Sequence, residues 1–180
     1  WTKRKIATVE DMKGLKTRTY DKNGALVVEA TGGTPYALPF SEVYSSLATG
    51  LIDSVITSTP TGVDGKFWEV LKYYHPMNIT VATDMVNVNL AAFNKLDKAT
   101  QEALIKAGQE MEAAMWAKVV EIDKEKEAIC NQNGIETVPA SKELLKSLSA
   151  VTEGIRNDWL KDAPPDARKI IEEFNQKVQR

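Results

Sequence analysis

The chain has 180 residues, 43% of them hydrophobic, so it is long enough to bury the core of a folded globular domain. Its 23 Lys and Arg residues nearly balance its 25 Asp and Glu residues, which excludes a broad positive surface for nucleic acid or an anionic membrane. One cysteine and one histidine exclude an internal disulfide framework and a cysteine-rich zinc site.

The first 78 residues alternate short apolar runs with helical segments, a pattern typical of an α/β unit with parallel strands. We predict a strand at "LKTRTY" (15–20) and a helix at "GALVVEATGG" (24–33) that ends at paired glycines. The prolines of "TPYALP" (34–39) restrict this segment to an edge strand or a short connection.

Three further elements complete this region. "SEVYSSLATG" predicts a helix with Ser41 as its N-cap, Gly50 at its end and an apolar face at Val43, Leu47 and Leu51. "LIDSVITS" (51–58) predicts a buried strand rich in β-branched residues. "GVDGKFWEVLKYY" (62–74) predicts another helix, whose apolar residues are Phe67, Val70, Leu71 and Tyr74.

The second half is mostly helical. Residues 79–92 predict an extended strand with Val81, Met85 and Val88 on one face. From Lys98 to about Asn133 apolar residues recur every three or four positions, which predicts a helix of about 50 Å at 1.5 Å per residue. This length exceeds the diameter of a domain of this size, so we expect the helix to cross between two lobes.

The C-terminal region predicts a short strand and two helices. The strand is "GIETVP" (134–139), and the helices are "SKELLKSLSAVTEGIRNDWLK" (141–161) and "PDARKIIEEFNQKVQ" (165–179). Pro165 suits the first turn of the second helix, because a residue there needs no N–H donor for the helix.

The residues offer little for catalysis or cofactor binding. His75 and Cys130 are far apart in the sequence, so no nucleophilic triad is indicated. We expect His75 to cap a helix end and Cys130 to act as a small apolar side chain. The glycine loops lack the spacing that cradles phosphates. We therefore predict no enzyme activity, no metal and no cofactor.

Arg18 stands at the carboxyl end of a predicted parallel strand, where open α/β sheets bind ligands. Its planar guanidinium suits a carboxylate held by two hydrogen bonds. The residues alone favour the ordinary interpretation, an exposed arginine in a weak surface ion pair, over a ligand anchor.

The order of three motifs adds further information. "EDMKGLKTR", "GGTPYALPFSEVYSSLATGLIDS" and "NKLDKATQEALIKAGQE" together resemble the DctP-type solute-binding proteins of tripartite ATP-independent periplasmic (TRAP) transporters. The resemblance covers essentially the whole chain and implies a two-lobed α/β periplasmic binding protein fold, with a parallel or mixed sheet, flanking helices and one long lobe-spanning helix.

Family members are longer than this chain, so the resemblance implies that the chain is their C-terminal part. Residues 1–78 would then belong to the second lobe, residues 79–118 would return to the first lobe, and residues 119–180 would pack on the second. The first lobe would lie mostly upstream. Without it, we expect Val81, Met85 and Val88 to expose apolar surface.

The resemblance also implies ligand contacts. Arg18 stands where the family has its carboxylate anchor, Phe40 matches an aromatic ligand contact, and Asn78 lies near a contact position of some relatives. Phe40 also suits a hydrophobic staple ahead of a helix. No metal site and no catalytic residue is implied.

One position departs from the family pattern. Many relatives place a Glu-Asn pair where this chain has Ile56 and Thr57. Thr57 and Ser58 still offer hydroxyl groups at the strand end, although both equally suit capping of the next helix. The change suggests a less polar wall, which would favour an aromatic or branched hydroxy acid over a sialic-acid-like sugar.

The resulting hypothesis is a periplasmic protein that captures an organic acid and delivers it to the small and large TRAP membrane subunits. It would use no covalent chemistry and bind no nucleic acid. Two alternatives remain open from the residues, namely a small α/β enzyme acting on an organic anion in the same crevice and a helical interaction module built on the long helix.

Overall fold

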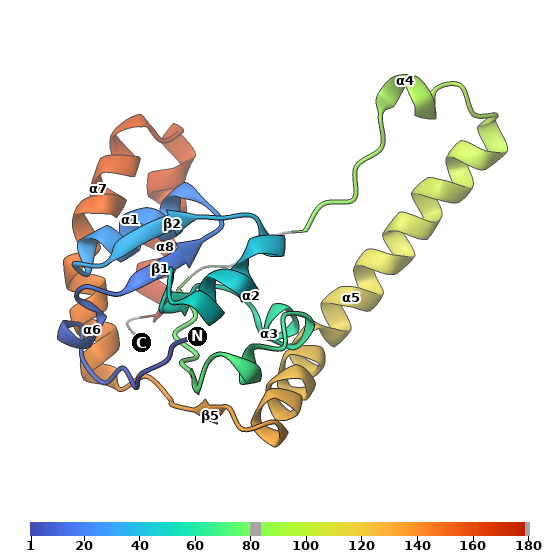
Figure 1. The fold of residues 1–180 in the computed structure, drawn as a ribbon. Helices are drawn as coiled ribbons and strands as arrows, with labels where there is room; N and C mark the ends of the chain where they lie inside the picture. Colours follow the sequence, from blue (N-terminus) through green and yellow to red (C-terminus); the bar gives the residue numbers. More distant parts are fainter. Residues whose placement is uncertain (80–83, 179–180) are drawn as a thin grey trace.

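The structure is a computed structural model that describes residues 1–79 and 84–178 (Figure 1). Its strands in this part of the chain are β1 (Lys16–Thr19), β2 (Thr34–Ala37), β3 (Ser54–Val55), β4 (Tyr73–Tyr74) and β5 (Glu136–Thr137). Its helices are α1 (Lys22–Ala30), α2 (Phe40–Thr49), α3 (Thr59–Asp64), α4 (Leu90–Phe93), α5 (Lys98–Gln132), α6 (Lys142–Val151), α7 (Glu153–Asp162) and α8 (Pro165–Val178), with 3₁₀ turns η1 (Glu10–Met12) and η2 (Phe67–Glu69).

The strands share one direction. β1 pairs in parallel with β2 on one side and with β3 on the other, and β4 pairs in parallel with β5. Thr2 forms antiparallel bridges with both Ser54 of β3 and Tyr73 of β4, so β4 runs in the direction of β3. The carboxyl ends of the five strands therefore lie on the same side of the sheet, which we call the carboxyl edge.

Buried apolar residues form two clusters. The larger cluster joins α2, β3, η2 and the end of α5; its buried members are Trp1, Val43, Leu47, Ile52, Val55, Phe67, Leu71, Cys130 and Ile135. The smaller cluster joins the N-terminal segment to α6 through Ile6, Val9, Leu15, Leu144 and Leu148. Burial of each large apolar side chain contributes about 1.5–3 kcal/mol, so these clusters hold the strands and helices together.

Most predicted elements are present. The strands at 15–20 and 51–58, the helix at 24–33, the edge strand at 34–39 and the strand at 134–139 all contain the expected element. The α/β class with parallel strands is confirmed. The predicted helix over 141–161 is instead two helices, α6 and α7, which are separated at Thr152.

The ends of α2 differ from the prediction. The N-cap position is Pro39, whose backbone is extended at φ −62° and ψ 152°, and Ser41 lies inside the helix. The fixed φ of proline sets the start of the helix two residues earlier than a cap at Ser41 would. Leu51 is 47% exposed because Gly50 adopts φ 76° and turns the chain, so that Ile52 points into the core instead.

The predicted helix over 62–74 is wrong. The helix α3 begins earlier, at Thr59, and ends near Gly65, where a β-carbon would lie 2.4 Å from the ring of Phe67. Lys66 then adopts a left-handed backbone at φ 47°. Tyr73 joins a strand, because its carbonyl accepts the N–H of Thr2 at 2.9 Å. Sheet pairing with distant residues overrides the helical pattern here.

The predicted strand over 79–92 has two outcomes. Residues 80–83, including Val81, lie outside the described residues. Residues 84–89 are described and belong to no strand, so the prediction is wrong for them; within the described residues no neighbouring segment pairs with them. The expected exposure of Met85 and Val88 is confirmed, at 75% and 62%.

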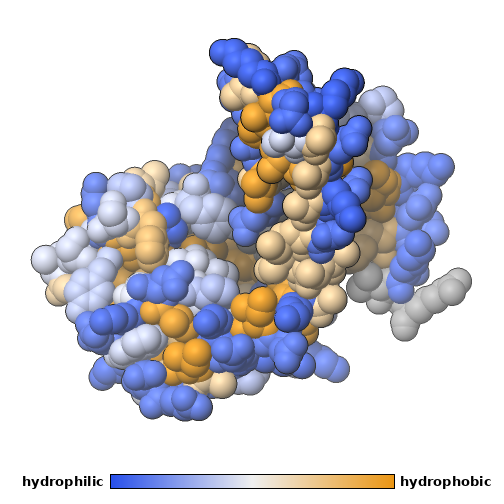
Figure 2. Space-filling model, turned by 90° about the vertical axis from the view of Figure 1, so that its right-hand side faces the viewer, coloured by the Kyte–Doolittle hydropathy of each residue, from blue (hydrophilic) through white to orange (hydrophobic). Residues whose placement is uncertain are grey.

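The long helix α5 is confirmed, with 35 residues and therefore a length of about 50 Å. Only its C-terminal part contacts the sheet region, and the rest projects away with α4 near its tip (Figure 1). Large apolar side chains remain exposed along the projecting part: Leu104, Ile105, Met111, Met115, Trp116, Val119 and Val120. Figure 2 shows apolar residues gathered along this arm.

No helix among residues 1–79 and 84–178 combines the length and apolar character needed to cross a membrane.

The core assignment predicts that truncating Leu47 and truncating Leu51 should have different effects on the free energy of unfolding. Leu47 is fully buried, so Leu47→Ala should lower the free energy of unfolding by about 2–5 kcal/mol through lost contacts and a cavity. Leu51→Ala, in a half-exposed position, should cost less than about 1 kcal/mol. Urea unfolding of both variants measures the difference, and equal losses would contradict the assigned core.

Candidate functional site

The candidate site lies at the carboxyl edge. In the sheet register Arg18 of β1 stands opposite Tyr36 of β2 and Val55 of β3. Leu38 and Thr57 each follow these partners by two residues, so the chain segments that leave three neighbouring strands meet around Arg18. Ligands bind at this end of the strands in open α/β sheets.

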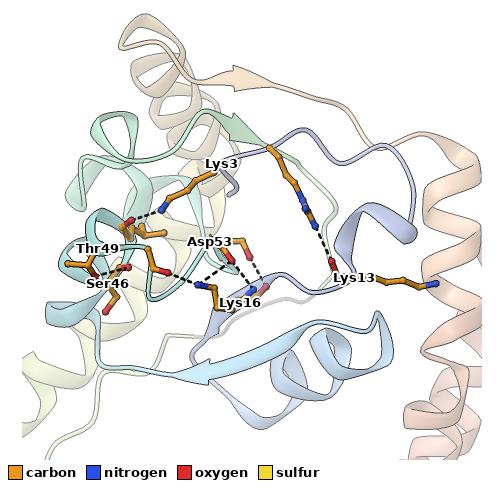
Figure 3. Close-up of polar contacts among 11 residues, drawn as sticks. Lys3, Lys13, Lys16, Ser46, Thr49 and Asp53 are labelled. Atoms are coloured by element: carbon orange, nitrogen blue, oxygen red, sulfur yellow. Dashed lines mark hydrogen bonds and ion pairs between the residues drawn. The ribbon is translucent and has the colours of Figure 1, made fainter.

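Polar contacts at the opposite ends of the strands fix this register (Figure 3). The Lys16 N–H donates to Asp53 Oδ2 at 3.3 Å, and the Asp53 N–H donates to the Lys16 carbonyl at 2.7 Å. The ammonium groups of Lys16 and Lys3 donate to the carbonyls of Gly50 and Leu47 at the end of α2, at 2.5 and 2.6 Å. These bonds hold β1, β3 and α2 in the alignment that places Arg18.

Arg18 is 7% exposed, and its Nε donates to the Leu38 carbonyl at 3.0 Å. Desolvation lowers the pKa of Arg18, an effect that the nearby Tyr20 opposes, and the guanidinium stays charged at physiological pH. Within the described residues, no Asp or Glu lies within salt-bridge distance of Arg18. The expected alternative of an exposed arginine in a surface ion pair is therefore wrong for this part of the chain.

The bond to Leu38 also determines how Arg18 meets an anion. A guanidinium has five N–H donors in a plane, and the Nε donor is taken by the backbone. The Nη groups are the donors that remain to hold a carboxylate. A buried cation next to apolar Val55 and Tyr36 is costly unless an anion compensates it, so the position is suited to an anionic ligand.

Thr57 and Ser58 follow β3 at the same edge. Thr57 is half-buried, and its carbonyl accepts the indole N–H of Trp1 at 3.1 Å. Ser58 is exposed at the N-cap position of α3, but its hydroxyl pairs with that of Thr61 at 2.9 Å and caps no backbone N–H. The alternative role of Ser58 as a capping side chain is thus wrong, and its ligand role stays a prediction.

Phe40 is 46% exposed and begins α2 two residues after Leu38. It lines a surface cavity of about 400 Å³ together with Tyr44, Lys66 and Glu69, and Arg18 is not part of that lining. The Tyr44 hydroxyl donates to Glu69 at 2.6 Å, which raises the pKa of Tyr44. Tyr44 is 42% exposed and therefore lies outside the buried core.

Asn78 lies four residues after β4, exposed and with a left-handed backbone at φ 49°. The topology therefore brings four of the predicted residues, Arg18, Phe40, Thr57 and Ser58, to adjacent strand ends of one sheet. Asn78 follows a strand further along the same edge. Among the described residues, no group of three or more His, Cys, Asp or Glu side chains is placed to hold a metal ion.

His75 follows β4 and does not cap a helix, so the predicted role is wrong. It is 8% exposed, and its Nε2 accepts the N–H of Ile6 at 2.9 Å. Desolvation, helped by the nearby Lys5, lowers the pKa of His75 from 6.5 to about 4, whereas Glu136 opposes the shift. The neutral ring thus connects the N-terminal segment to the end of β4.

Leu38 and Asp53 support the site, but neither role is predicted from the sequence. The carbonyl of Leu38 orients Arg18, but a backbone acceptor leaves no mark in the residue type. Asp53 lies within the quoted motif "GLIDS", yet its bond to β1 depends on sheet pairing across 37 residues. A charged aspartate inside the predicted buried strand at 51–58 is the signal that could have pointed to it.

Comparisons with known proteins identify the family and support the fold. Residues 1–162 match the family model DctP, described as bacterial extracellular solute-binding protein, family 7. The chain belongs to this family. The 2,3-diketo-L-gulonate-binding periplasmic protein YiaO of Escherichia coli K12 is 30% identical over 178 residues, which cover 93% of this chain and 52% of that protein.

Solved structures of the family share the fold. DctP6 of Bordetella pertussis, an extracytoplasmic solute receptor that binds pyroglutamic acid, is 32% identical with a TM-score of 0.84, covering 98% of this chain and 58% of that chain. DctP7 of the same organism, which also binds pyroglutamic acid, is 27% identical with a TM-score of 0.84, covering 97% and 58%. The chain thus spans about half the length of the relatives it matches.

The buried histidine predicts a pH dependence of stability. Because the folded state lowers the pKa of His75, the unfolded chain binds more protons between pH 6.5 and about 4, and stability falls as pH falls through this window. The gap of about 2.5 pH units corresponds to at most about 3 kcal/mol.

Urea unfolding at pH 7 and at pH 4.5 tests this dependence. His75→Gln removes the titration, so the variant should lose less stability than the parent on acidification. Carboxylates contribute equally to both proteins, and the difference between them therefore isolates His75. Equal losses in the two proteins would contradict the assigned environment.

Proposed function

We propose that the chain is the C-terminal part of a solute-binding protein that captures an organic acid for a TRAP membrane transporter. The observation that carries the proposal is Arg18, a buried arginine whose Nε is held by the backbone and whose Nη groups have no acidic partner among the described residues. A ligand carboxylate would supply the missing negative charge through two parallel hydrogen bonds.

The division into lobes follows from the same proposal. Residues 1–78 would form the second lobe, residues 79–118 would return to the first lobe, and residues 119–180 would pack on the second. An arm of α5 that exposes Met111, Trp116 and Val120 at 61%, 68% and 63% needs a covering layer, because monomeric proteins rarely leave so large an apolar patch open. We propose that the upstream half of the same protein is that layer.

The ligand would carry at least one carboxylate. Relatives bind pyroglutamic acid and 2,3-diketo-L-gulonate, according to their names, and this range indicates that residues other than the arginine select the acid. The half-buried Ile56 and the exposed Phe40 supply apolar surface near the strand ends of this chain. We therefore propose a compact acid with an apolar, branched or aromatic body and hydroxyl contacts from Thr57 and Ser58.

The cellular setting would be that of the relatives. Their names place them in the periplasm, and we propose the same location here, with the small and large TRAP membrane subunits as partners. The described residues present no nucleophile with an adjacent base near Arg18, which favours capture of the acid without covalent chemistry. Turnover of a bound acid would favour the enzyme alternative instead.

Substitution of Arg18 tests the anchor. In the protein with its upstream half, Arg18→Ala should weaken binding of a carboxylate ligand at least about 100-fold, because a charge-assisted bidentate pair is lost. Arg18→Lys should recover only part of the affinity, since an ammonium group cannot form the planar pair. Isothermal titration calorimetry with L-pyroglutamate, and with acids released from the purified protein, measures the change.

The matched control is Lys22→Ala, which removes an exposed positive charge at the start of α1. It should bind as the parent does. If Arg18→Ala bound the acid as tightly as the parent, Arg18 would not be the anchor.

The upstream half should cover the arm of α5. The dye 1-anilinonaphthalene-8-sulfonate reports exposed apolar surface, so the 180-residue chain should enhance its fluorescence strongly and the longer protein should not. In the 180-residue chain, Met111→Lys with Trp116→Lys should lower the signal, whereas Lys106→Ala should not. A strong signal from the longer protein would contradict the proposed covering.

A further inference from the structure

Thr59 is a buried polar residue that the candidate site leaves unexplained. It is the first residue of α3 and directly follows Thr57 and Ser58. Its side chain is 0% exposed, unlike the exposed Ser58 beside it. A hydroxyl removed from water at this depth requires a hydrogen-bond partner within the protein.

The partner is Asp123 of α5. The Thr59 hydroxyl lies within hydrogen-bond distance of the Asp123 carboxylate and also 3.2 Å from the Asp123 carbonyl. The bond joins residues 64 positions apart, and α3 packs closely against α5 at this point. A hydroxyl that donates to a carboxylate forms a charge-assisted bond, which is stronger than a neutral one.

Asp123 stands where α5 meets the sheet region, at residues 122–130, which we call the root of α5. Residues before it project away and are exposed, whereas Cys130 at the other end of the root is 1% exposed. A second bond holds the root, from the Thr137 hydroxyl to Glu127 at 2.8 Å. Burial, and then the charges of the nearby Asp123 and Glu127, raise the pKa of Tyr74 in β4 to about 12.

We propose that Thr59 is a positioning residue, whose bond to Asp123 couples the Thr57–Ser58 segment to the root of α5. This inference rests on the proposed function, in which the arm of α5 carries the first lobe. Movement of the arm would act at Asp123, then at Thr59, and then at the two residues that are expected to touch the ligand. Closure of the lobes and placement of these hydroxyls would thereby be one event.

The test uses substitutions that separate the hydroxyl from the rest of the side chain. Thr59→Val keeps the shape and removes the hydroxyl, and Thr59→Ser keeps the hydroxyl. The matched control is Thr61→Val on the same helix, because the Thr61 hydroxyl pairs with Ser58 and does not reach α5. All are made in the protein with its upstream half.

The first measurement requires no ligand. Spin labels on cysteines introduced at Lys106 of the arm and Ser149 of α6 report the arm position by pulsed electron paramagnetic resonance. Cys130 stays unlabelled because it is buried. Thr59→Val should broaden the distance distribution about twofold, and amide exchange of residues 59–65 should become roughly tenfold faster. Thr59→Ser and Thr61→Val should match the parent.

The second measurement is the affinity for L-pyroglutamate. Thr59→Val should weaken binding about tenfold, and Thr59→Ser should restore the affinity. The titration is run well below the unfolding temperature of every variant, where reduced stability alone would not change the affinity. If Thr59→Val left the arm distribution and the exchange rates unchanged, or if Thr61→Val disturbed them equally, the coupling would be overturned.

The two hypotheses fail in different ways. If the parent binds no organic acid, the proposed function fails while the ligand-free distance distribution still decides the coupling. If the parent binds the acid and Thr59→Val has the distribution and affinity of the parent, the coupling fails while the proposed function stands.

Discussion

The parallel pairing of β1 with β2 and β3 sets the geometry of the candidate site. It places Arg18 opposite Tyr36 and Val55, so the segments that leave three strands meet at one point. Two hydrogen bonds between Lys16 and Asp53, one to the Lys16 carbonyl and one to the Asp53 carboxylate, fix this register two residues before Arg18. A slip by one residue would turn Arg18 to the other face of the sheet, away from its contact with Leu38.

Burial of a guanidinium is unfavourable unless its donors and its charge are compensated. The Leu38 carbonyl satisfies the Nε donor and keeps the plane of the group fixed, while no carboxylate among the described residues compensates the charge. A group that is fixed in advance loses little entropy when an anion binds. The fold thus maintains a costly feature whose compensation would come from a ligand.

The helix α5 has two different surroundings along its length. Its root contributes Cys130 to the larger core cluster and bonds to Thr59 and Thr137, whereas its arm exposes apolar residues such as Met111 and Trp116. One end of the helix thus packs in the core of the sheet region, whereas its arm presents an apolar surface that the described residues leave uncovered. The chain belongs to a family whose matched relatives are about twice as long.

Local sequence patterns were enough to predict the α/β class, the position of Arg18 at a strand end and the length of α5, because periodicity and strand order depend on nearby residues. Other features depend on contacts between distant parts of the chain. The pattern over 62–74 is helical, but Gly65 packs on Phe67 and Tyr73 pairs with Thr2, so the chain forms a turn and a strand. The bonds of Arg18 to Leu38 and of Thr59 to Asp123 join residues 20 and 64 positions apart, and such partners are chosen by the packing of the whole chain.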